Sequence, residues 1–183
     1  MSLHSLRDAD DLDKGVQFDV TTTTGFLVAA RNVLRVVPGG VLHGGVPCSS
    51  WVFLSRGSSK RSKQFPQGDT GRAHVLTANL ITSRFALLVL VALARSVYWC
   101  IEQPLSSLMP AYLPMTHVMT MTAEYVGLSY SSFAMGMYGA FSLKPTQLWG
   151  SLSGPQDIVG FWGQDSSFMN AEFTHALTWA AQW

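Results

Sequence analysis

Segments of strand length alternate with longer segments of helical periodicity along most of this chain. The strand-like segments are residues 16–20, 41–46 and 97–101, and the helical segments are residues 24–37 and 74–95. Threonines that can cap a helix precede the first helical segment, and Pro38-Gly39-Gly40 ends it. A helix that connects two strands returns the chain to the edge where the first strand began, so the strands run parallel. The alternation therefore predicts an α/β fold, a three-layer αβα sandwich around a mostly parallel sheet.

The later part of the chain predicts a helix and then two neighbouring strands. The helix covers residues 115–126, and the strands cover residues 132–138 and 146–152. Strands with no helix between them pair antiparallel. We therefore expect a late antiparallel strand pair at the end of the parallel sheet.

The composition indicates one folded domain. Of the 183 residues 48% are apolar, as in ordinary globular proteins, but only 13% are charged, against about 25% in such proteins. A chain of this length buries enough surface to fold without disulfides, so we expect Cys48 and Cys100 to be free thiols in a reducing compartment. The expected organisation is a flexible acidic segment (residues 1–15), the α/β domain (16–152), and a C-terminal loop and helix that pack on it (153–183).

The sequence predicts neither export nor a membrane span. The N-terminal residues contain four aspartates and no apolar run, which argues against a signal peptide and for an intracellular location, nuclear or cytoplasmic. The strongest apolar run, Phe85–Ala94, has ten residues, whereas a membrane span needs about 20. We expect a buried helix there.

Positive charge is concentrated in the first half of the chain. Residues 1–95 contain eleven Lys and Arg against six Asp and Glu, whereas residues 96–183 contain one lysine against five acids. The densest part is the basic segment, residues 56–72, which is also rich in serine and glycine. These features predict an exposed, mobile loop that binds a polyanion, nucleic acid first. The alternative is a solvated loop that keeps an apolar protein soluble.

Two short motifs follow strands that we expect to be neighbours in the sheet. Pro47-Cys48-Ser49-Ser50-Trp51 follows residues 41–46, and Glu102-Gln103-Pro104 follows residues 97–101. Ligands of open α/β sheets bind at the carboxyl ends of the strands. A deprotonated cysteine is a strong nucleophile, and a carboxylic acid can share a proton with a ring nitrogen, so the pair suits attack on an electron-poor heterocycle. The alternatives are a buried inert thiol at Cys48 and a carboxylate that caps the next turn at Glu102.

Other catalytic and cofactor motifs are absent from the sequence. The five histidines are isolated and the two cysteines form no Cys-x-x-Cys pair, so no metal site is predicted. Gly39-Gly40 and Gly44-Gly45 are not followed by Lys-Ser/Thr, which excludes a phosphate-binding P-loop.

The order strand, Pro-Cys, basic segment, helix, strand, Glu-Gln-Pro resembles the cytosine-C5 DNA methyltransferase-like branch of the class I S-adenosylmethionine-dependent methyltransferases. The later block MGMYGAFSLKPTQLWG looks like a Lys-Pro-Thr segment of divergent relatives, so the resemblance covers roughly residues 16–152. It implies a Rossmann-like methyltransferase sheet, S-adenosylmethionine as cofactor and DNA as partner. It also implies that Cys48 attacks C6 of a flipped cytosine while Glu102 contacts N3.

The resemblance implies further contacts of the site. The basic segment would close over DNA, and Asp19 and Pro47 would border the cofactor, with a structural role as the alternative for Asp19. The cations that would contact DNA are Arg56, Lys60, Arg61, Lys63, Arg72 and Lys144.

The chain also departs from the family's pattern. No glycine-rich turn opens a helix, and only about 15 residues precede residue 16, so the resemblance implies that the first two strands and their helices are missing. Ser49 stands where the family has glutamine, and no Gln-x-Arg-x-Arg segment follows Glu102. The sequence therefore supports two functions: methyl transfer to carbon 5 of cytosine in DNA, or a non-catalytic methyltransferase-like fragment that acts as a nucleic-acid-binding or structural module.

Overall fold

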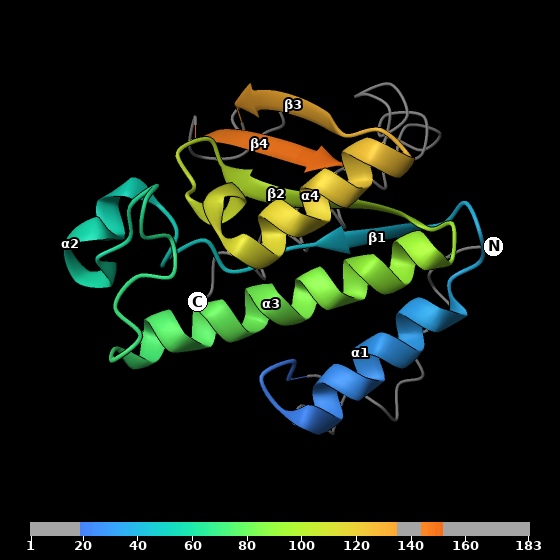
Figure 1. Cartoon of the computed structure of the whole chain (residues 1–183), viewed down its shortest axis with the longest axis horizontal. Helices are drawn as coiled ribbons and strands as arrows, with labels where there is room; N and C mark the ends of the chain where they lie inside the picture. The colour runs from blue at the N-terminus through green and yellow to red at the C-terminus, as the bar shows by residue number, and fades with distance from the viewer. Residues whose placement is uncertain (1–18, 135–143, 152–183) are drawn as a thin grey trace.

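The computed structural model describes residues 19–134 and 144–151, which form an α/β fold with a four-stranded mixed sheet (Figure 1). The strands are β1 (Val41–Gly44), β2 (Tyr98–Pro104), β3 (Ser129–Ala134) and β4 (Pro145–Gly150). The helices are α1 (Thr23–Arg35), α2 (Arg56–Ser59), α3 (Ala73–Ala94) and α4 (Leu113–Tyr125), with short 3-10 helices η4 (Phe53–Ser55) and η5 (Met109–Ala111). The expected segments at residues 1–15 and 153–183 lie outside the described residues.

The sheet has the strand order β1-β2-β4-β3. β1 and β2 are parallel neighbours, as the sequence predicts, and β4 runs antiparallel to both β2 and β3. The pairing of β1 with β2 ends at Gly44 and Ile101, but β2 continues to Pro104 because its last residues pair with β4. Strand periodicity alone does not reveal that extension, which places Glu102 inside β2 instead of after it.

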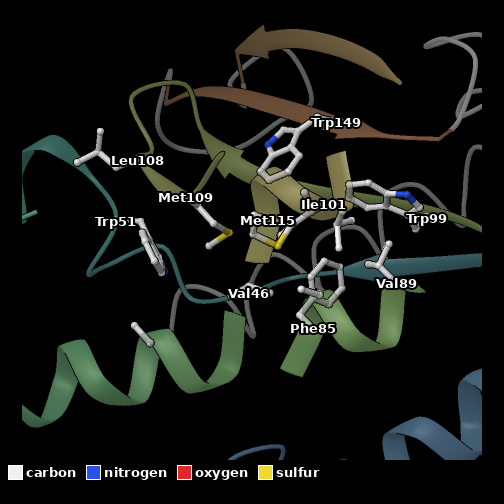
Figure 2. Close-up of a cluster of buried hydrophobic side chains, with 13 residues drawn as sticks. Val46, Trp51, Phe85, Val89, Trp99, Ile101, Leu108, Met109, Met115 and Trp149 are labelled. Atoms are coloured by element: carbon white, nitrogen blue, oxygen red, sulfur yellow. The ribbon is translucent and has the colours of Figure 1, made fainter. Parts of the chain in front are cut away.

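The helices α1, α3 and α4 pack on one face of the sheet. Side chains alternate between the two faces of a strand, and Trp99 and Ile101 of β2 lie on the face that α3 and α4 cover. Figure 2 shows Phe85 of α3, Met115 and Trp149 gathered around these two residues. α1 packs against α3 in a second cluster that includes Leu42 of β1. No described helix contributes to a core cluster on the opposite face, which carries Cys100, Glu102 and Leu148.

α3 is apolar on most of its surface. It is the one helix among the described residues that is long and apolar enough to cross a membrane. Half of its most apolar stretch is buried in the protein, and the core helix of a soluble protein passes the same test. The expected helix is present and covers 22 residues, more than the ten of the apolar run. The expectation that this run is buried holds for Phe85, Leu88 and Val89, but Leu87 is 51% exposed.

α1 begins within the threonine run, with Thr23 and Thr24 as its first residues. Thr22 caps the helix by accepting a hydrogen bond from the Gly25 amide (3.0 Å). A side chain at position 25 would lie 2.0 Å from the Asp19 carbonyl oxygen, so only glycine fits there. The predicted strand at residues 16–20 is wrong at its end, because Asp19 and Val20 lead into this capping turn, and residues 16–18 lie outside the described part.

Candidate functional site

The segment that carries Cys48 lies against the end of β2. Gln103 is fully buried, and its Nε2 donates a hydrogen bond to the carbonyl oxygen of Val46 (2.7 Å). The Ser107 hydroxyl donates to Gln103 Oε1 (3.0 Å), which fixes the orientation of the amide. In the sequence, Gln103 is notable only as the middle residue of the Glu-Gln-Pro motif. In the structure, its side chain connects the Pro-Cys segment to the Glu-Gln-Pro segment.

Backbone hydrogen bonds close a turn at Cys48. The amides of Trp51 and Val52 both donate to the Cys48 carbonyl oxygen, at 2.8 and 3.2 Å. The Leu108 amide donates to the Trp51 carbonyl oxygen (2.9 Å), which links this turn to the chain after β2. The conformation of the chain directly after Cys48 is therefore set by backbone hydrogen bonds.

Glu102 is a buried carboxylate with one described ionic partner. Its side chain is 6% exposed, and Lys144 Nζ lies 3.6 Å from Oε1. Oε1 is fully buried and receives no hydrogen bond from the part of the chain that the structure describes. Buried carboxylate oxygens are normally hydrogen-bonded. This atom is therefore a candidate contact for a ligand that donates a hydrogen bond.

Cys48, Glu102 and Lys144 form one electrostatic cluster, here called the thiol cluster. The pKa of the half-buried Cys48 thiol is raised above its usual value, first by burial. The Lys144 charge lowers that pKa and the Glu102 charge raises it, so both groups lie within electrostatic range of the sulfur. The structure thus brings Cys48 and Glu102 together at one end of the parallel pair, and it adds Lys144, which the resemblance places among the DNA contacts.

The basic segment is folded, and the expectation of an exposed, mobile loop is wrong at Arg61. This side chain is 2% exposed, and its guanidinium stacks 3.5 Å from the centre of the Trp51 ring. The segment contains α2, and the Asp69 amide donates to the Ser59 carbonyl oxygen (2.8 Å), which folds the chain back over Arg61. Burial lowers the pKa of Arg61 to about 10, and the interaction with Tyr112 opposes this shift, so Arg61 stays charged at neutral pH but faces no external ligand.

The other cations of the basic segment differ in exposure. Lys60 and Lys63 are exposed. Arg72 is exposed but pairs with Asp69 (3.0 Å), and this hydrogen bond is the first cause that lowers the pKa of Asp69. Arg56 is partly buried, with its guanidinium 4.4 Å from the centre of the Phe53 ring. Lys60, Lys63 and Arg72 are therefore the exposed cations of the segment, and of these Arg72 has a described ion pair.

The two candidate cofactor residues lie apart in the chain's fold. Pro47 directly precedes Cys48, beside the thiol cluster. Asp19 stands at the start of α1, which lies outside α3 in Figure 1. Both oxygens of its carboxylate accept hydrogen bonds from Thr21, at 2.8 Å each, and these bonds are the main reason that the pKa of Asp19 is lowered. Asp19 is thus part of a turn that precedes a helix.

The remaining buried ionisable groups give no second site. Burial raises the pKa of Cys100 to about 12, so this thiol stays protonated at neutral pH. His43, its partner in the β1–β2 register, has a pKa lowered by burial and is neutral. Residues 19–134 and 144–151 contain no group of three or more His, Cys, Asp or Glu that could hold a metal ion.

Comparisons with models of protein families, with curated proteins and with solved structures each found no match. The motifs and the geometry of the thiol cluster are therefore the features of this chain that point to a function.

Proposed function

We propose that this chain is a DNA cytosine-C5 methyltransferase-like protein and that the thiol cluster binds a cytosine base taken out of the DNA stack. The observation that carries the proposal is the buried Glu102 carboxylate, whose Oε1 receives no hydrogen bond from the described residues and whose charge acts on the thiol of Cys48, four residues after the neighbouring parallel strand β1. An N–H donor on a heterocycle would satisfy this oxygen. The same proposal assigns the chain to a three-layer, Rossmann-like sandwich.

The chemistry assigned to this chain's residues begins with the Cys48 thiolate. The sulfur adds to C6 of the base, the C5–C6 π electrons move to C5, and C5 becomes nucleophilic. Glu102 takes up a proton from water when the base binds and shares it with N3, and the protonated N3 withdraws electrons from C6; the proton returns to water when the base leaves. Without another electrophile, C5 takes a proton from water. Loss of the original C5 hydrogen and departure of the thiolate then restore cytosine with an exchanged hydrogen.

The thiol cluster provides a way to activate Cys48. Burial and the Glu102 charge both raise the pKa of the thiol, and Lys144 lowers it. A protonated N3 bound to Glu102 compensates the carboxylate charge, so base binding removes one of the influences that oppose ionisation. We therefore expect Cys48 to be more acidic when the base is bound than when the site contains water.

The described residues do not fit S-adenosylmethionine, the methyl donor that the resemblance implies. The Asp19 carboxylate is already hydrogen-bonded to Thr21, and Pro47 has no backbone N–H to donate. Gly44 has a packing role instead, because a Cβ there would lie 2.4 Å from the Phe85 ring. The chemistry of the described residues therefore ends with protonation of C5, and methyl transfer to C5 is implied by the resemblance alone.

The experiment measures exchange of the cytosine C5 hydrogen with water. DNA tritiated at C5 is incubated with the protein, with and without S-adenosylmethionine, and released tritium is counted. We expect release by the unmodified chain and by Cys100→Ala, which removes the other thiol. We expect none from Cys48→Ala, and release lowered about 100-fold for Glu102→Gln. Release by Cys48→Ala equal to that of the unmodified chain, or no release by the unmodified chain, would rule out the proposal.

A second candidate function is a non-catalytic nucleic-acid-binding module. The poor fit of the described residues to the cofactor and the exposure of Lys60 and Lys63 favour it. A module of this kind binds DNA without releasing tritium. Fluorescence anisotropy with labelled DNA at several salt concentrations, measured on the same samples, separates the two functions.

A further inference from the structure

Arg61 joins three segments of the chain that are distant in sequence. Its Nε donates to the Ser50 hydroxyl (3.0 Å), in the turn that follows Cys48. Its Nη1 donates to the Pro66 carbonyl oxygen in the basic segment, and its Nη2 donates to the Val75 carbonyl oxygen (3.4 Å) in the first turn of α3. The face of the guanidinium covers the ring of Trp51, which is fully buried. One side chain therefore fastens the Cys48 turn to both the basic segment and α3.

The chain around Arg61 is closely packed. Gly68 has a φ of 64°, a left-handed conformation that favours glycine. A Cβ at Gly68 would lie 2.5 Å from the Ser59 carbonyl oxygen and 2.8 Å from Arg61 Cγ. The chain at Gly68 therefore passes so close to the aliphatic part of the Arg61 side chain that only glycine fits there.

Arg61 is a buried cation without a described carboxylate partner. The ion pairs found among the described residues are Arg72 with Asp69 and Lys144 with Glu102. Burial of a charge without a counter-charge is unfavourable, and an apolar side chain of the same size often serves stability as well or better. Stability alone therefore does not explain why an arginine is buried at position 61. A guanidinium is planar and donates several hydrogen bonds in fixed directions, so it fixes the positions of the groups that accept them.

That geometry acts on Cys48 through the backbone. Arg61 contacts Ser50 and Trp51, and the Trp51 amide donates to the Cys48 carbonyl oxygen. We propose that Arg61 is a positioning residue that holds Cys48 in the thiol cluster by clamping the Ser50–Trp51 turn. The proposal goes beyond the proposed function, because it holds for any ligand that the cluster binds.

The test measures the position of Cys48 without an activity assay. Alkylation by iodoacetamide is followed by mass spectrometry at Cys48 and Cys100 over a range of pH, and amide hydrogen exchange is followed at Trp51 and Val52. Arg61→Met fills the same space without the hydrogen bonds. We expect it to raise the Cys48 alkylation rate and the exchange of both amides about tenfold, as local opening becomes easier. Arg61→Lys keeps the positive charge but loses the planar guanidinium and its fixed hydrogen-bond directions. This variant should raise the alkylation and exchange rates by an intermediate factor.

The pH profile separates positioning from a change in charge. Arg61 is not among the groups that shift the pKa of Cys48, so the midpoint of the alkylation profile should stay constant in Arg61→Met. Cys100 is buried and is alkylated only when the protein unfolds globally, so its rate should stay low.

Asn79→Ala is the matched control. Its Nδ2 donates to the Gln67 carbonyl oxygen (2.9 Å), so it ties the same basic segment to α3, and none of its described hydrogen bonds goes to the Cys48 turn. This variant should leave Cys48 alkylation unchanged. Ser50→Ala, which removes only the acceptor of Arg61 Nε, should raise it about threefold, and it decides the question if Arg61→Met fails to fold. Unchanged alkylation and amide exchange in the clamp variants, or an equal increase in Asn79→Ala, would overturn the proposal.

Discussion

Lys144 and Arg61 are two cations close to the same cysteine, in opposite surroundings. Lys144 is 41% exposed at its side chain and lies opposite a buried carboxylate. Arg61 is buried, and its described partners are neutral oxygens and an aromatic ring. The first cation acts on the ionisation of Cys48, and the second acts on the position of Cys48. The local sequence does not distinguish these two roles, because it shows only that both residues are positively charged.

Removal of the Arg61 side chain should have the largest effect on stability. Arg61→Ala leaves a cavity and takes the hydrogen-bond donors from the three oxygens that it contacts. A desolvated cation–π contact and hydrogen bonds to a charged group together suggest a loss of about 3 kcal/mol in the free energy of unfolding. Urea denaturation measures this value. Arg72→Ala, which removes an exposed cation of the same segment, should leave the urea midpoint unchanged; a similar loss in both variants would remove the contrast between the two kinds of cation.

Removal of the Lys144 charge should have a smaller effect than removal of the Arg61 side chain. It should change the ionisation of Cys48 instead of the stability of the fold. Lys144 lowers the pKa of Cys48, so Lys144→Gln should raise that pKa and move the alkylation profile toward higher pH. A partly exposed ion pair contributes up to about 1 kcal/mol, so the rate on the rising part of the profile should fall by up to about fivefold. Lys60→Gln is the control, and a profile that does not move in Lys144→Gln would place this lysine outside the cluster.

Removal of Lys60 and Lys63, two of the exposed cations of the basic segment, should have the smallest effect on the fold. The double variant Lys60→Gln, Lys63→Gln should keep the stability of the unmodified chain within about 0.5 kcal/mol. If the chain binds DNA, the slope of log affinity against log salt concentration should decrease by about two units, one for each lost phosphate contact. An unchanged slope would show that these lysines do not contact the phosphates.

The sequence predicts the sheet that carries the site better than it predicts the surroundings of the site. The parallel pairing of β1 and β2 follows from the strand–helix–strand order, and that pairing places the segments of Cys48 and Glu102 side by side. The extension of β2 through Glu102 depends on pairing with β4, about 45 residues later in the chain, and strand periodicity contains no information about such a partner.

The burial of Arg61 was missed for a related reason. Serine, glycine and charge in the basic segment are typical of exposed loops, and nothing in the local pattern indicates that Trp51 and Ser50 lie against one of its cations. Only the structure explains why glycine is needed at two positions: a side chain at Gly68 would collide with Arg61, and a side chain at Gly44 would collide with Phe85. The role of Gln103 was also missed, because a buried amide is recognisable only from its partners, here Val46 and Ser107.

If Cys48 and Glu102 act in one site, the ionisation of Cys48 responds to the charge of Glu102. Because the Glu102 charge raises the pKa of the thiol, neutralising it should lower that pKa. The alkylation profile of Cys48 should therefore move to lower pH in Glu102→Gln, and it should stay in place in Glu124→Gln, which changes an exposed carboxylate of α4. A Cys48 profile with the same midpoint in Glu102→Gln and in the unmodified chain would contradict the account.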